Sequence, residues 1–126
     1  MPQNLVDRTA LARMIPCDGV GAEIGVLRAH YAKILYDNCA PKLLYLVDRW
    51  TLNGPDDWPV GAIWEEILTE ARSHFAGCDN VEFVISDSVA WLNSMPTGSL
   101  DWVYIDACHS YTEVFAEIIA SRRVVK

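Results

Sequence analysis

Four short apolar runs, each followed by a helical pattern, set the limits on how this chain can fold. The runs cover residues 20–24, 43–47, 81–85 and 102–105. After each run, apolar residues recur at three- and four-residue spacing, as on one face of a helix. Strands that alternate with helices are typical of a parallel sheet with helices on both faces. We therefore expect an α/β, Rossmann-like fold with about four strands.

The helical segments have recognisable ends. Pro16 and Pro41 each stop a segment, because proline cannot continue a helix, and Gly77 is a further stop signal. Ser110, followed three residues later by Glu113, forms a capping-box pattern at the start of the last helix. The predicted helices cover residues 4–15, 28–38, 59–76, 88–93 and 110 onward. The last helix is expected to bury Val114, Phe115, Ile118 and Ile119.

Length and composition restrict the classes of protein that this chain can belong to. Its 126 residues predict one domain, residues 1–126. Lys and Arg number 10 and Asp and Glu 17, a net charge of −7, so we expect no binding to nucleic acid or to an anionic membrane. No apolar run approaches the roughly 20 residues of a membrane span, and no signal-peptide core follows the polar N-terminus. The four cysteines form no CxxC pair, which favours reduced thiols and a cytoplasmic location.

The predicted strands all end at glycine or acidic residues. Gly25 follows the first strand, Asp48 the second, Asp87 the third and Asp106 the fourth. Because the carboxyl ends of parallel strands meet at one edge, where such sheets bind ligands, we expect these residues to lie together. Each has a simpler interpretation, as a tight turn at Gly25 or a helix cap at an aspartate. Glu23, at the end of a buried strand, needs a partner, either loop amides or an ammonium group.

The glycine pattern bears on the type of nucleotide. Asp48, 23 residues after Gly25, could accept bonds from both ribose hydroxyls. Only Gly25 follows the first strand, with Ala29 four positions later, whereas a pyrophosphate cradle needs several glycines there. The chain also lacks a P-loop lysine. A nucleoside ligand without phosphates fits this loop better than a dinucleotide.

Four segments carry a resemblance to a known family: GAEIGVLRA, YLVDRW, VEFVISDSVAWL and SLDWVYIDACHSYTEV. In this order they resemble class I S-adenosylmethionine-dependent methyltransferases, most of all the bacterial small-molecule and sugar O-methyltransferases. The family pattern at the fourth strand is D-hydrophobic-I-D-G-x-H-x-Y, and this chain has Asp101, Ile105, Asp106, His109 and Tyr111 there. The resemblance covers about residues 19–120 and implies the strand order 3-2-1-4.

The resemblance also implies roles for individual residues. Glu23 and Gly25 would lie beside the methionine part of S-adenosylmethionine, and Asp48 would bind its ribose. Asp87 and Ser88 resemble the pair that recognises adenine.

At the fourth strand, Asp106 resembles a catalytic-site acid that binds a divalent metal in some relatives, which makes Mg²⁺ a candidate cofactor. His109 resembles the general base that takes the proton of the acceptor hydroxyl. Cys108 replaces one candidate metal ligand and suits a hard cation poorly.

The family has about seven strands, whereas this sequence supplies four and stops at Lys126. We therefore expect a C-terminally truncated, partial fold. Its fourth strand would be an open apolar edge, and such edges invite association. A second copy of the chain, or a partner chain, is expected to cover it.

The resulting hypothesis is methyl transfer from S-adenosylmethionine to a hydroxyl of a small molecule or sugar. Two alternatives stay open: a non-catalytic remnant that binds the cofactor, and a nicotinamide-dependent dehydrogenase domain. His30 and His74 lie in predicted helices without an evident ligand set, and we expect solvent or packing roles for both.

Overall fold

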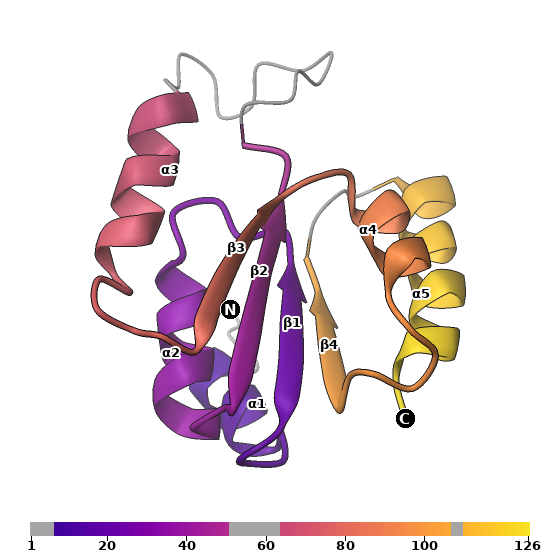
Figure 1. Ribbon diagram of the computed structural model, residues 1–126, viewed down its shortest axis with the longest axis horizontal. Coiled ribbons are helices and arrows are strands. Elements are labelled where there is room, and N and C mark those ends of the chain that lie inside the picture. The colour runs from indigo at the N-terminus through magenta and orange to yellow at the C-terminus, as the bar shows by residue number, and fades with distance from the viewer. Residues whose placement is uncertain (1–6, 51–63, 107–109) are drawn as a thin grey trace.

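The strands form one parallel sheet in the order β3-β2-β1-β4, as expected (Figure 1). The computed structural model describes residues 7–50, 64–106 and 110–126. Its strands are β1 (Val20–Ile24), β2 (Leu43–Asp48), β3 (Val81–Ile85) and β4 (Trp102–Ile105). Their bounds agree with the predicted ranges, except that β2 includes Asp48.

The register aligns the carboxyl ends of the strands. Ile24 of β1 lies opposite Val47 of β2 and Ile105 of β4. Asp48 lies opposite Ile85 of β3. The residues that follow these four positions therefore emerge at a single edge of the sheet.

Helices cover both faces. Their bounds are α1 (Arg8–Arg13), α2 (His30–Cys39), α3 (Trp64–Ser73), α4 (Ser88–Ser94) and α5 (Tyr111–Val124). Asp7 begins α1 by accepting a bond from the Thr9 amide, so the described helix is shorter than the predicted range 4–15. The predicted start of the third helix at Pro59 lies outside the described residues.

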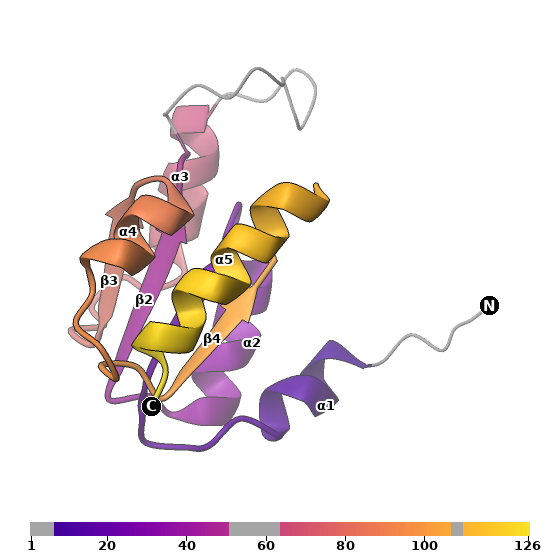
Figure 2. The ribbon, with the colours of Figure 1, turned by 90° about the vertical axis from the view of Figure 1, so that its right-hand side faces the viewer.

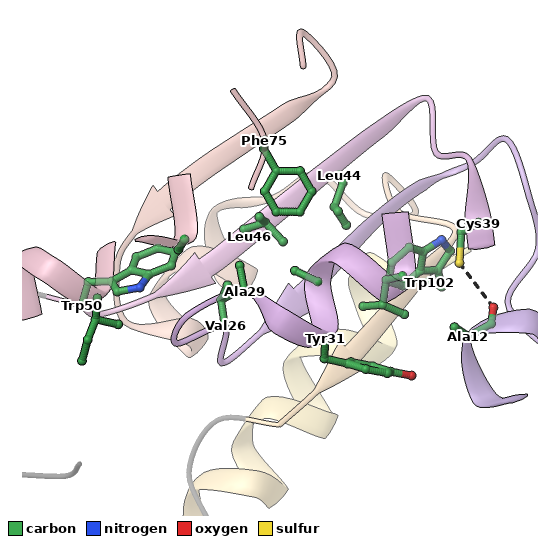
Figure 3. Packing of buried hydrophobic residues seen from close by; sticks show 14 residues of the cluster. Ala12, Val26, Ala29, Tyr31, Cys39, Leu44, Leu46, Trp50, Phe75 and Trp102 are labelled. Carbon is green, nitrogen blue, oxygen red and sulfur yellow. Dashed lines mark hydrogen bonds between the residues drawn. The ribbon is translucent and has the colours of Figure 1, made fainter. Parts of the chain in front are cut away.

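One apolar cluster joins α1, α2 and α3 to the sheet. Figure 3 shows Leu44 and Leu46 of β2 close to Phe75, with Trp50 and Trp102 at opposite ends of the cluster. Trp50 is 1% exposed, and its indole N–H donates to the carbonyl of Leu27 at 2.9 Å. On the opposite face a second cluster joins α4 and α5 to β1 and β2.

The prediction for the buried face of α5 is wrong. Phe115, Ile118 and Ile119 are about half exposed, and Val114 is only partly buried. The buried residues of this helix are Glu117, Ala120, Ser121 and Val124. The helix is rotated in this way because Ala120 and Val124 pack into the second cluster. Its apolar side instead lines an open hollow of about 350 Å³, formed by Tyr111, Val114, Phe115 and Ile118.

The edge of the sheet beside β4 carries a short pairing at its amino end. α5 runs alongside β4 (Figure 2), and Val125, just after it, forms a parallel bridge with Leu100. Lys126 donates its amide to the carbonyl of Leu100 at 2.9 Å. The coverage of this edge by a second copy or a partner chain stays a prediction. None of the described helices has the length and apolar content of a membrane span.

Candidate functional site

The loop after β1 has a backbone that only particular residues adopt easily. Gly25 has φ of 90°, a left-handed value at which any other residue would be strained. Leu27 and Ala29, with φ of 54° and 67°, are left-handed as well. The amide of Gly25 still donates to Val47 at 2.9 Å, so the loop leaves the sheet only beyond this point.

Asp48 fixes the shape of this loop. Its Oδ2 accepts hydrogen bonds from the amides of Val26 at 2.9 Å and Leu27 at 2.8 Å. Its Oδ1 accepts the longer bond from the Trp50 amide at 3.2 Å. The carboxylate thus joins the end of β2 to the glycine loop, and the predicted proximity of Gly25 and Asp48 is confirmed.

Glu23 is a buried carboxyl in the middle of the sheet. It is 2% exposed, and its Oε1 finds no hydrogen-bond partner among residues 7–50, 64–106 and 110–126. Burial, together with the nearby carboxylates of Asp106 and Asp48, holds the pKa of Glu23 well above its ordinary value, and Arg8 opposes the shift. A buried carboxyl oxygen without a partner is costly, so this position is suited to a ligand that donates a hydrogen bond or carries positive charge.

Arg8 reaches this edge from α1. Its guanidinium pairs with Asp106 at 3.1 Å and lies over the Tyr31 ring, 4.1 Å from the centroid. The Tyr31 hydroxyl donates to the Arg8 carbonyl at 2.9 Å, and desolvation raises the pKa of Tyr31 to about 12. Sequence reasoning missed Arg8, because it lies 98 residues before Asp106 and in a different element.

The donors around Asp106 do not fit the expected Mg²⁺. One oxygen of Asp106 is paired with a guanidinium, and the side chain belongs to no group of three potential metal ligands among residues 7–50, 64–106 and 110–126. Mg²⁺ prefers several oxygen ligands. His109, the expected base, and Cys108 lie outside the described residues.

Asp87 and Ser88 lie where the sequence predicts, but both are engaged within the protein. Asp87 caps α4 by accepting from the Ala90 amide at 2.9 Å, and it pairs with Arg49 at 2.8 Å. These contacts, that of Arg49 most of all, lower the pKa of Asp87. The Ser88 hydroxyl donates to buried Glu117 of α5 at 2.5 Å. Sequence reasoning missed Arg49 as the partner of Asp87, although its position directly after Asp48 places it at the same edge of the sheet.

The residues predicted to bind the ligand lie along one edge of the sheet. The amide of Ser86 donates to the carbonyl of Asp48 at 3.0 Å, which brings the end of β3 beside the end of β2. The amide of Gly25 is bonded to the carbonyl of Val47, so the end of β1 also lies beside the end of β2. Glu23, Asp48 and Asp87 therefore lie one after another along this edge of the sheet. The resulting order is a buried carboxyl, a glycine turn, an amide-holding aspartate and an aspartate at a helix start.

Comparisons with known proteins bear on the family and the fold. A family model described as Methyltransferase domain matches residues 20–126. No curated protein matches the chain.

Among solved structures, the precorrin 8w decarboxylase of Methanobacterium thermoautotrophicum is similar with a TM-score of 0.66 and 15% identity, over 100% of this chain and 60% of that one. TYW2 of M. jannaschii, solved in complex with AdoMet, has a TM-score of 0.59 and 16% identity, over 100% and 50%. An S-adenosylmethionine-dependent methyltransferase from Mesorhizobium loti has a TM-score of 0.61 and 18% identity, over 93% and 47%. At these identities the likeness concerns the fold, and the chain spans about half to three fifths of these proteins.

Proposed function

Since this chain belongs to the methyltransferase domain family, we propose that it binds S-adenosylmethionine at the carboxyl edge of its sheet. We propose further that the whole protein transfers the methyl group to a hydroxyl of a small molecule or sugar. The observation that carries the proposal is the buried Oε1 of Glu23, which lies within two residues of the Gly25 turn and has no hydrogen-bond partner in the described part of the chain.

The methionine end of the ligand fits this place. Glu23 offers a carboxyl oxygen that no group of the described residues satisfies, and an ammonium group would supply both a donor and a positive charge. A cationic partner lowers the pKa of a carboxyl, so an ammonium group would oppose the upward shift that burial and the carboxylates of Asp106 and Asp48 impose on Glu23. The missing side chain at Gly25 lets a ligand approach the backbone.

Asp48 is suited to hold the ribose. Each carboxylate oxygen accepts about two hydrogen bonds. Oδ2 is used by two loop amides, whereas Oδ1 accepts only the longer bond from Trp50 among the contacts of the described residues. Oδ1 therefore keeps capacity for a ribose hydroxyl while Oδ2 maintains the loop.

The adenine end would meet Asp87. Since Arg49 already pairs with Oδ1 of Asp87, an adenine amino group would share this carboxylate with the guanidinium or displace it. Ser88 is turned toward Glu117, so its backbone rather than its hydroxyl is the better candidate for a contact with the base.

Methyl transfer to a hydroxyl requires that the acceptor be placed close to the methyl group and that the hydroxyl proton be removed. S-adenosylmethionine, when bound, supplies a methyl group on a sulfonium centre. His109 is proposed as the base that would take the proton of the acceptor hydroxyl. Asp106 is proposed as an acid at the site, held by Arg8, and no step is assigned to a metal.

One observation favours a second candidate, a cofactor-binding domain without catalysis. The acid expected at the reaction centre, Asp106, is neutralised by Arg8 at 3.1 Å. An ion pair of this kind reduces the ability of the carboxylate to orient or activate an acceptor. The dehydrogenase alternative has no such support, and the family match favours a methyltransferase.

Calorimetric titration with S-adenosylhomocysteine tests the proposal, with NAD as the comparison ligand. We expect binding of S-adenosylhomocysteine, no binding of NAD, and about 10-fold or greater weakening in Asp48→Asn, which corresponds to about 1.4 kcal/mol. Asp37→Asn is the matched control, because Asp37 is an exposed carboxylate of α2 paired with Lys33. Equal binding in Asp48→Asn and wild type, or binding of NAD alone, would contradict the proposal.

Turnover separates the two candidates. The assay uses a labelled methyl donor and a panel of hydroxyl acceptors. If the protein is a methyltransferase, label should be transferred to an acceptor. His109→Ala should lose this transfer and still bind S-adenosylhomocysteine. Binding without transfer to any acceptor favours the non-catalytic candidate.

A further inference from the structure

Two histidines and a glutamate meet where the start of α2 lies beside the second half of α3. His30 begins α2, Glu70 lies in the second half of α3, and His74 follows the end of that helix. Their ligand atoms all lie within 4.8 Å of one another. The sequence gives no sign of this group, because folding brings together residues that are 40 positions apart. The expected solvent or packing roles of His30 and His74 stay a prediction.

The spacing on α3 is part of the reason. Glu70 and His74 are four residues apart, which places them on the same side of a helical turn. The Nε2 atom of His30 lies 2.9 Å from Oε2 of Glu70, and that of His74 lies 3.9 Å from the same oxygen. In a tetrahedral site with bonds of about 2.1 Å, ligand atoms lie about 3.4 Å apart, between the two observed distances.

The hydrogen bonds of the cluster leave one atom unsatisfied. Nε2 of His74 is buried and has no hydrogen-bond partner within the described ranges of the chain. Neither tautomer solves this problem, because a buried ring nitrogen needs an acceptor when it carries a proton and a donor or a metal when it does not. A metal ion bound by the lone pair of this nitrogen would satisfy it.

Arg28 prepares Glu70 for such a role. Its guanidinium pairs with Oε1 of Glu70 at 2.7 Å, which leaves Oε2 facing the two imidazoles. A residue that holds the second oxygen of a ligating carboxylate is a common support around metal sites.

We propose that His30, Glu70 and His74 bind one divalent transition-metal ion of the Zn²⁺ class, and that this ion joins α2 to α3. Two imidazole nitrogens and one carboxylate oxygen are typical Zn²⁺ ligands and unsuited to Mg²⁺ or Ca²⁺. The fourth position is left for water or an external ligand. This site does not depend on the function proposed above.

The site has a structural consequence near the candidate functional site. Arg28 belongs to the loop between the Gly25 turn and α2, and His30 is the first residue of α2. A metal that fixes Glu70 and His30 would hold this loop against α3. Metal binding is therefore expected to raise the melting temperature of the chain.

The test is Zn²⁺ titration of the chelator-treated protein by calorimetry, followed by Co²⁺ absorption spectroscopy. We expect one Zn²⁺ per chain, with affinity lowered at least about 100-fold in His30→Gln, Glu70→Gln and His74→Gln. Glu66→Gln, one turn earlier on the same helix and exposed, is the matched control and should bind as wild type does. Mg²⁺ should not compete.

Three results would overturn the proposal. These are no binding of Zn²⁺, equal binding in the variants and the control, and thiolate-to-Co²⁺ charge-transfer bands, which would assign the ion to cysteines instead. Melting curves in chelator show whether each variant is folded, so loss of binding in a folded variant is attributable to the missing ligand.

Discussion

The contact between β1 and β4 depends on the absence of a single side chain. Gly21 lies opposite Trp102 in the register of these strands. A Cβ built on Gly21 would lie 2.0 Å from Cε2, 2.2 Å from Cζ2 and 2.5 Å from Cδ2 of the Trp102 indole. Gly21→Ala is therefore a direct test of this packing.

The cost follows from these distances. Carbon atoms in favourable contact lie about 3.5–4.0 Å apart, so the indole or the strand must move by about 1.5 Å. Overpacking of a core costs about 1–3 kcal/mol, and Trp102 is only 7% exposed, so we expect the upper end, about 3 kcal/mol. The melting temperature should fall by about 10 °C.

Urea unfolding followed by far-ultraviolet circular dichroism measures this change without relying on tryptophan fluorescence. Gly77→Ala is the comparison, because Gly77 has φ of 81° and no atom within 4 Å of the added Cβ. It should cost only about 1–2 kcal/mol, from the left-handed backbone. A cost for Gly21→Ala no larger than that of Gly77→Ala would refute the packing argument.

A double-mutant cycle that combines Gly21→Ala with Trp102→Leu tests whether the indole is the cause of the cost. Removing the indole should relieve the clash, so Gly21→Ala should cost at least about 1 kcal/mol less in the Trp102→Leu background than in wild type. Additive effects of the two substitutions would show that the indole is not what excludes a side chain at residue 21.

Three further predictions concern other contacts. Ala40→Gly should raise the free energy of unfolding by about 0.5–1 kcal/mol in urea titrations, because exposed Ala40 ends α2 with φ of 41°, where glycine is less strained. Ser88→Ala should lower it by about 1–3 kcal/mol, since buried Glu117 then loses its hydroxyl donor. Glu23 has a folded-state pKa above its ordinary value of 4.5, so the native state binds its proton more tightly than the unfolded chain does. Its contribution is favourable at low pH and is lost as pH rises from about 4.5 through the folded pKa; unfolding measured from pH 4 to 8 should show this decline in wild type and not in Glu23→Gln.

The sheet was predictable because its signal is local. The runs at residues 81–85 and 102–105 are apolar and bounded by turn residues, and their predicted bounds equal those of β3 and β4. Parallel topology then fixes which strand ends meet, so the proximity of Gly25 and Asp48 followed from the order of elements alone.

The rotation of α5 was not predictable in the same way. The helix has apolar residues on two sides, with Phe115 and Ile118 on one and Ala120 and Val124 on the other. A prediction from hydrophobic periodicity therefore buries the side with the larger apolar residues, Phe115 and Ile118. The structure buries the smaller residues because α5 packs closely on α4, and Glu117 is accepted into that contact through Ser88.

Contacts between distant positions were missed for a different reason. Arg8 with Asp106, and His30 with Glu70, join residues in separate elements whose lateral placement no local pattern specifies. Trp50 closely follows Asp48, but its ring lies in the core and its indole N–H donates to the carbonyl of Leu27. A polar ring nitrogen with a partner in reach makes such burial acceptable.

Asp48 accepts hydrogen bonds from the amides of Val26 and Leu27, so the loop is ordered before any ligand arrives. The conformational entropy of these loop residues is lost during folding. Binding of a nucleoside therefore carries no further cost for ordering the loop, and its affinity depends on the contacts that the ligand makes. Retention of this aspartate in related sequences is then a poor indicator of ligand binding, since a descendant that had lost all activity would still require it to keep the same backbone.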